Sequence, residues 1–140
     1  MKNLLSLFFI FCFSVSVAIA ENIQYGYNAN GEYVPVSVDG KRVEYGYNAK
    51  GKYVPISIGN ERIQYGYNAN GEYVPSSVGN KKVEYNYNAR GEYKPSSIGN
   101  QKIEYGYNSN GDFAPSSIGG RRIRYNYGSN GTYLPTMIGN

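Results

Sequence analysis

The chain repeats itself every twenty residues from position 21 to its end. One tyrosine position recurs in all six copies, at Tyr25, Tyr45, Tyr65, Tyr85, Tyr105 and Tyr125. A fixed period of this length is typical of repeat architectures, in which each unit buries its apolar face only against its neighbours. The repeat therefore predicts a single domain over residues 21–140. Its six units span 21–40, 41–60, 61–80, 81–100, 101–120 and 121–140.

The first twenty residues have the pattern of a secretory signal peptide. Lys2 gives a positive start, residues 4–13 are apolar, and Ala18-Ile19-Ala20 places small residues before a cleavage site. Cleavage after Ala20 would leave 120 residues and would remove Cys12, the chain's single cysteine. We therefore expect residues 1–20 to be a signal peptide and no membrane span to remain after cleavage. The expected location is secreted, periplasmic or at the cell surface.

Each unit reads as a β-hairpin. In the second unit, Val43–Tyr47 alternates with a period of two and is rich in strand-forming residues. Residues 48–51 have turn chemistry, and Gly59-Asn60 suits a tight primed turn. A four-residue loop and a two-residue turn leave two seven-residue arms per unit. No helical periodicity follows the first twenty residues.

These loop lengths predict the strand register and the core. They place Val43 opposite Ile56 and Gly46 opposite Tyr53, so that an aromatic ring covers a glycine. One side of the hairpin then carries the Ile/Val position and both tyrosines of the Tyr-x-Tyr motif, and this side is the predicted core. The third tyrosine of each unit, the Tyr53 position, is predicted to face outward.

A proline occupies one position of every return arm: Pro35, Pro55, Pro75, Pro95, Pro115 and Pro135. Because proline cannot donate to a strand ladder, we expect a short return strand followed by an extended bend. Wide sheets also twist and curl. The predicted fold class is all-β, with tandem antiparallel β-hairpin repeats forming a solenoid or a rolled sheet.

The segment Gly79–Glu92 contains the pattern Gly, basic residue, then Tyr-Asn-Tyr-Asn-x-x-Gly. It resembles the YD (Rhs-type) tyrosine-rich repeat of bacterial surface and toxin-delivery proteins, and the likeness extends over all six units. The resemblance implies hairpins that spiral into a β-shell. Where that family has Asp after the second tyrosine, this chain has Asn28, Asn48, Asn68, Asn88 and Asn108, then Gly128. The recurrent proline also departs from the family, and six units are too few to enclose a toxin domain.

The units are also loosely similar to the aromatic cell-wall-binding repeats of Gram-positive surface proteins. Those repeats are hairpins of similar length with an aromatic pair, Asn or Asp, and Gly. The resemblance implies glycan binding, although the tryptophans on which that family relies are absent here.

The residue inventory argues against an enzyme. The chain has no histidine, and without Cys12 the usual nucleophile and base sets are missing. Serines such as Ser76 and Ser96 are expected to bond to the backbone instead. Asn68 and Glu72 faintly resemble part of a calcium loop, but a plain turn is favoured. We expect no catalytic residue, no cofactor and no metal.

The charge is mildly basic. The formal net charge is +4, or +3 without Lys2, and the main basic patch is Arg121, Arg122 and Arg124. A nucleic-acid binder would concentrate more charge on one face, so nucleic acid is not an expected partner.

The seventeen tyrosines are the strongest functional signal. The outward row predicted to bind a ligand is Tyr33, Tyr53, Tyr73, Tyr93 and Tyr133. Such rings stack on sugars or anchor a partner protein. Three hypotheses follow: a secreted, non-enzymatic structural or adhesive interaction module at the cell surface, a glycan- or cell-wall-binding module, and a self-assembling amyloid-like matrix protein. The candidate partners are polysaccharide or cell wall, a surface protein, and further copies of this chain.

Overall fold

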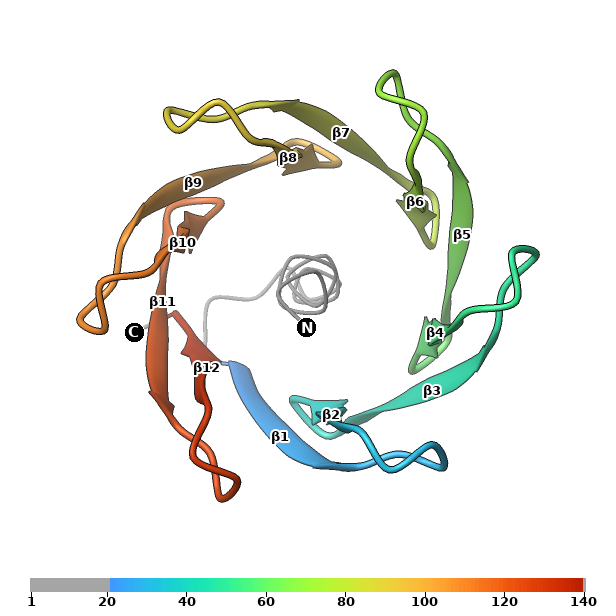
Figure 1. Ribbon diagram of the computed structural model, residues 1–140, viewed down its shortest axis with the longest axis horizontal. Helices are drawn as coiled ribbons and strands as arrows, with labels where there is room; N and C mark the ends of the chain where they lie inside the picture. The colour runs from blue at the N-terminus through green and yellow to red at the C-terminus, as the bar shows by residue number, and fades with distance from the viewer. Residues whose placement is uncertain (1–20, 140) are drawn as a thin grey trace.

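The structure is a computed structural model that describes residues 21–139, so the predicted signal peptide lies outside the described residues. These described residues form twelve strands: β1 (Glu21–Tyr27), β2 (Tyr33–Val38), β3 (Lys41–Tyr47), β4 (Tyr53–Ile58), β5 (Glu61–Tyr67), β6 (Tyr73–Val78), β7 (Lys81–Tyr87), β8 (Tyr93–Ile98), β9 (Gln101–Tyr107), β10 (Phe113–Ile118), β11 (Arg121–Tyr127) and β12 (Tyr133–Ile138). All neighbouring strands are antiparallel, and β1 pairs with β12, which closes a barrel (Figure 1).

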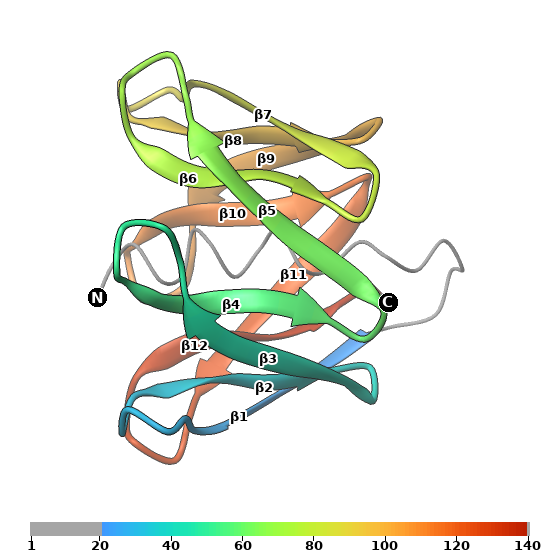
Figure 2. The ribbon, with the colours of Figure 1, turned by 90° about the vertical axis from the view of Figure 1, so that its right-hand side faces the viewer.

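The prediction of an all-β fold built from antiparallel hairpins is confirmed, and closure of the barrel is an additional finding. Each unit contributes one hairpin, formed by an odd-numbered strand and the even-numbered strand that follows it. Figure 2 shows the long hairpin loops at one end of the barrel and the tight turns at the other. In Figure 1 the six long loops project outward around the ring.

The predicted register within each hairpin is wrong. Val43 pairs with Ile58 rather than Ile56, and Gly46 pairs with Val54 rather than Tyr53. The long loop has five residues rather than four, and the register shifts between Glu44 and Tyr45 on β3. The aliphatic side chain of Ile56 covers this glycine. A Cβ built at Gly46 would lie 3.1 Å from Cδ1 of Ile56.

A β-bulge at the proline explains the register shift. Pro55 pairs with Tyr45 and Ser57 pairs with Glu44, so Ile56 is an extra residue between them. The predicted short return strand is therefore wrong, since β4 continues through the proline to Ile58. The bulge disrupts the ladder beside a residue that has no N–H to donate, so proline fits inside the strand at this point.

In the third to fifth units, the bulged residue is a serine that compensates for the disrupted ladder. The hydroxyls of Ser76, Ser96 and Ser116 each donate to a backbone carbonyl of the paired strand at 3.2 Å. The prediction that these serines bond to the backbone is confirmed. The predicted primed turns also occur, since Gly59 has a φ of 56° and both Asp39 and Gly40 have positive φ.

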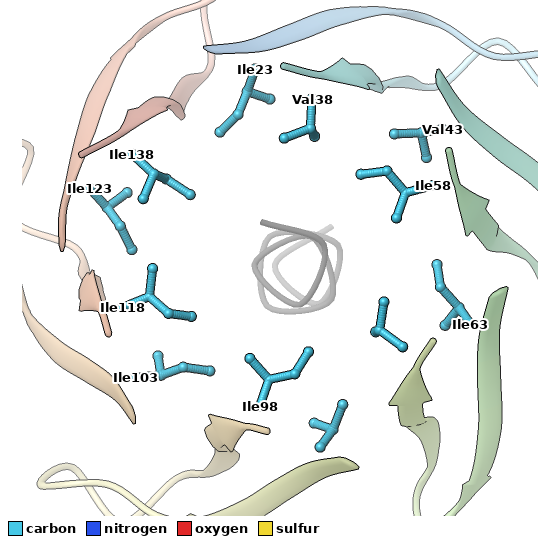
Figure 3. Packing of buried hydrophobic residues seen from close by; sticks show 12 residues of the cluster. Ile23, Val38, Val43, Ile58, Ile63, Ile98, Ile103, Ile118, Ile123 and Ile138 are labelled. Carbon is cyan, nitrogen blue, oxygen red and sulfur yellow. The ribbon is translucent and has the colours of Figure 1, made fainter. Parts of the chain in front are cut away.

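The core is a ring of twelve Ile and Val side chains, two from each unit. They point toward the centre of the barrel in Figure 3 and are no more than 6% exposed. They are Ile23, Val38, Val43, Ile58, Ile63, Val78, Val83, Ile98, Ile103, Ile118, Ile123 and Ile138. The first tyrosine of each Tyr-x-Tyr motif packs against this ring. The second does not, and its assignment to the core was wrong: Tyr47, for example, is 67% exposed.

The pairing between hairpins explains why this second tyrosine leaves the core. Within the second hairpin five residue pairs form, but β4 and β5 are joined only at Ser57–Arg62 and Ile58–Glu61, next to the tight turn. Neighbouring hairpins therefore diverge toward the loop end. The last residues of each odd-numbered strand are carried away from the core with the diverging hairpin.

A ring of hydrogen bonds bridges these diverging seams. The first tyrosine of each motif donates its hydroxyl to the proline carbonyl of the preceding hairpin. The five bonds between consecutive units are Tyr45–Pro35, Tyr65–Pro55, Tyr85–Pro75, Tyr105–Pro95 and Tyr125–Pro115, at 2.6–2.8 Å. Tyr25 donates to the Pro135 carbonyl at 2.6 Å and so joins the first unit to the last.

The seam between the last and first units explains the unusual residues of the last loop. The Tyr33 hydroxyl lies 2.9 Å from Oγ of Ser129, and the Ser129 N–H donates to the Tyr33 hydroxyl at 3.3 Å. A Cβ at Gly128 would lie 3.0 Å from Cε2 of Tyr33. Glycine therefore replaces the asparagine of the other units where the two ends of the repeat array meet.

We expect Tyr85→Phe to lower the free energy of unfolding by about 1 kcal/mol, because the Pro75 carbonyl loses its donor while the ring remains. Urea denaturation measures the change. Tyr47→Phe is the matched control, since Tyr47 is 67% exposed, and we expect a change below about 0.5 kcal/mol. Equal effects of the two variants would contradict this role for the seam hydrogen bond.

Gly128→Asn restores the residue of the other units, yet we expect it to destabilise the barrel by about 1–3 kcal/mol through contact with the Tyr33 ring. In a double-mutant cycle, Tyr33→Ala should remove most of this added penalty, because the two residues are in contact. Thermal unfolding of the four proteins measures the coupling. Additive effects would show that the contact does not select glycine.

Candidate binding grooves

Three aromatic rings cluster on one side of every hairpin. In the third unit, the ring centroids of Tyr65 and Tyr73 are 6.1 Å apart and the rings are nearly parallel, while Tyr67 meets Tyr73 edge-on at 5.0 Å. We call this set the three-ring cluster. Offset and edge-to-face arrangements of this kind stabilise aromatic pairs. Phe113 takes the Tyr73 position in the fifth unit and keeps the same geometry.

The diverging seams leave grooves beside these clusters. One groove has a volume of about 500 Å³ and extends over the second, third and fourth units. Lys50, Lys52 and Val54 of one hairpin line it, together with Tyr65 and Tyr67 of the next. Its wall thus combines aromatic rings with flexible cationic and polar groups.

The loops of the second, third and fifth units reach the exposed tyrosine of the following unit. The Lys50 Nζ lies 5.3 Å from the centroid of the Tyr67 ring, a cation–π contact. At the next seam the equivalent contact is a hydrogen bond from the Tyr87 hydroxyl to Asn70 Oδ1, at 3.3 Å. At these seams the middle loop residue therefore sets the polarity around the exposed ring.

Two further grooves are copies of one another. One lies between the third and fourth units, with a volume of about 330 Å³, and the other between the fifth and sixth units, with about 390 Å³. Their lining residues correspond at a spacing of forty residues: Tyr67 and Tyr85 in the first match Tyr107 and Tyr125 in the second. The grooves are therefore a property of the repeat.

The loops of the first five units are built as asparagine turns. Oδ1 of Asn68 accepts the N–H groups of Asn70 and Glu72 at 2.9 and 3.0 Å, and Nδ2 of Asn68 donates to the Glu72 carboxylate at 3.0 Å. Since backbone groups occupy the Asn68 oxygen, the loop reads as a turn. Residues 21–139 contain no group of three or more acidic, histidine or cysteine side chains placed to hold a metal ion.

The structure places the predicted ligand-binding row at the centre of the three-ring clusters. Tyr33, Tyr53, Tyr73, Tyr93 and Tyr133 are half-buried. The rings most open to solvent are instead Tyr27, Tyr47, Tyr67, Tyr87, Tyr107 and Tyr127, at 59–67% exposure. Sequence reasoning missed this second row because it assigned both tyrosines of the motif to the core. The available signal was its position directly before the loop, at the rim of the hairpin.

The predicted basic patch is divided by the fold. Arg122 and Arg124 are exposed and line the groove between the fifth and sixth units, whereas Arg121 is half-buried at the start of β11. Two of the three arginines therefore belong to a groove that also contains aromatic rings.

Burial raises the pKa of the tyrosines that form the seam hydrogen bonds. The effect holds for Tyr45, Tyr65, Tyr85 and Tyr105. Nearby ionisable groups act in the same direction, as Glu92 does for the pKa of Tyr105. These hydroxyls stay protonated and can donate to the proline carbonyls well into the alkaline range.

No family model, curated protein or solved structure matches this chain. The resemblance to YD repeats therefore stays a prediction. In the described part of the chain, no helix has the length and apolar character needed to cross a membrane.

The raised tyrosine pKa values predict the alkaline limit of stability. A tyrosine in the unfolded chain ionises near pH 10, while the folded chain holds the proton more tightly. The unfolded state therefore binds fewer protons above about pH 10, and the free energy of unfolding falls as the pH rises beyond that value. Urea denaturation on either side of about pH 10 measures the fall. A variant with phenylalanine at the four positions should show a shallower dependence, and an unchanged slope would contradict the prediction.

Proposed function

We propose that residues 21–140 form a non-enzymatic binding module that holds saccharide chains at the cell surface. The observation that carries the proposal is the row of six tyrosines, 59–67% exposed, beside grooves lined by further aromatic rings. An exposed ring next to an apolar wall suits the C–H face of a sugar. Mixed aromatic and polar linings of this kind are typical of ligand sites.

The clusters are organised before any ligand binds. Tyr73 is held between Tyr65 and Tyr67, and Tyr65 is in turn fixed by its hydrogen bond to the Pro55 carbonyl. Binding at such a site costs little side-chain entropy, because the rings are already ordered. The ammonium groups of Lys50 and Lys52 at the loop supply hydrogen-bond donors for sugar hydroxyls.

Repetition supports a polymeric ligand. The long loops lie at one end of the barrel (Figure 2), and each exposed tyrosine directly precedes one of them along the chain. A chain that contacts two or more grooves binds the later ones at a high effective concentration, so weak single sites give a useful total affinity.

Of the two other hypotheses, the structural or adhesive one uses the same grooves, and the amyloid-like one is less well supported. A surface protein could place its side chains in the same grooves, as the structural or adhesive hypothesis requires. The amyloid-like hypothesis relied on end units that template other chains, but β1 and β12 pair with each other at Glu21–Ile138 and Asn22–Met137. Saccharide binding is the reading that uses both the exposed rings and the polar groove walls.

The experiment is retention of the purified protein on insoluble polysaccharides and cell-wall preparations. We expect Tyr47→Ala, Tyr67→Ala and Tyr87→Ala together to lower the apparent affinity at least tenfold, because about 1 kcal/mol is lost at each exposed ring. The same three positions changed to Phe form the control, which keeps the rings and should keep most of the binding. Unchanged retention of the alanine variant, or no retention of the native protein on any saccharide, would refute the proposal.

A further inference from the structure

The sixth unit departs from a pattern of ion pairs on the odd-numbered strands. The second, fourth and fifth units have a cation two residues before a glutamate on the odd-numbered strand. These pairs are Arg42–Glu44, Lys82–Glu84 and Lys102–Glu104, at 3.7–4.0 Å. In the sixth unit the same two positions hold Arg122 and Arg124, so two like charges replace an ion pair.

Both arginines line one groove. Residues two apart on a strand point to the same side, about 6.6 Å from each other along it. Arg122 and Arg124 are exposed, and they line the groove together with Tyr107, Tyr125 and Tyr133. Of the described residues that line this groove, none is acidic. The corresponding groove between the third and fourth units contains Lys82 and Glu84 instead.

We propose that the groove between the fifth and sixth units is an anion-selective subsite for a carboxylate-bearing sugar of an acidic polysaccharide. The aromatic rings contact the sugar ring, while the guanidinium groups of Arg122 and Arg124 donate to its carboxylate. Planar guanidinium groups bind carboxylates through two parallel hydrogen bonds, which gives both strength and orientation. The inference rests on the proposed function and adds the class of saccharide that this groove selects.

The distribution of charge favours an acidic saccharide over a nucleic acid. Single-stranded nucleic acid also combines ring stacking with arginine, but it presents a phosphate at every nucleotide and needs a continuous basic path. The equivalent position in the other units is Gln24, Glu44, Gln64, Glu84 and Glu104. One groove with two cations, followed around the barrel by neutral or acidic positions, fits a single anionic contact.

The test compares a 1,4-linked oligomer of a uronic acid with the same oligomer after reduction of its carboxyl groups. Titration calorimetry with the mature protein should show about tenfold tighter binding of the acidic oligomer, and the preference should weaken as salt is added. Arg124→Glu restores the pattern of the fourth unit beside Arg122 and should abolish the preference. Glu84→Arg is the matched variant, because it creates a second pair of cations and should increase the preference.

The outcomes distinguish the proposed function from the inference about the carboxylate. Binding of both oligomers with equal affinity supports the proposed function and overturns this inference. No binding of either oligomer, with no retention on other saccharides, overturns both. A phosphorylated oligosaccharide and a single-stranded oligonucleotide complete the set: tighter binding of the phosphorylated sugar would overturn the assignment to a carboxylate, and tighter binding of the oligonucleotide would overturn the assignment to a saccharide.

Discussion

The hydrogen bond from tyrosine to a proline carbonyl holds the barrel together at its weakest points. Neighbouring hairpins share only two residue pairs at each seam, and the proline inside each return strand has no N–H for the ladder. The tyrosine hydroxyl of the next unit reaches that proline's carbonyl at 2.6–2.8 Å. Six such bonds, at about 0.5–1.5 kcal/mol each, are comparable with the net stability of a small domain. The same divergence that requires the bond also opens the grooves.

The sequence predicted the features that follow from the repeat period and the residue types. It did not predict the features that depend on the β-bulge and on the divergence of neighbouring hairpins. Alternation at Val43–Tyr47 predicted the strand, Gly59 predicted the primed turn, and the Val43 position predicted half of the core ring, whereas the other half, represented by Ile58, was missed. The register failed because a bulge at Pro55 cannot be counted from spacing alone. The exposed row was missed because Tyr47 has the strand parity of a core residue but lies beyond the last residue pair that joins its strand to the preceding hairpin.

The end units differ because they meet. In an open array, unusual terminal repeats shield an exposed face. Here the Tyr25 hydroxyl donates to the Pro135 carbonyl, and the Cβ of an asparagine at position 128 would lie only 3.0 Å from Cε2 of Tyr33. The last loop is thus adapted to the first unit. The pairing of β1 with β12 at Glu21–Ile138 and Asn22–Met137 also closes the ring of hairpins, which leaves fewer free strand-edge groups as a template for aggregation.

A closed ring of identical units would present the same groove at every seam. Selectivity for a ligand must therefore come from positions that neither build the core nor make the seam hydrogen bonds. Tyrosine, proline and the core residues are constrained by the seam and the ring. Two other positions are not constrained in this way. The middle residue of the long loop varies between units, for example from Lys50 to Asn70, and the exposed position before the first tyrosine varies from Glu84 to Arg124. The variation falls on side chains that line the grooves. The side chains that line each groove can therefore change without loss of the barrel. The groove between the fifth and sixth units, with its two arginines, is one such change.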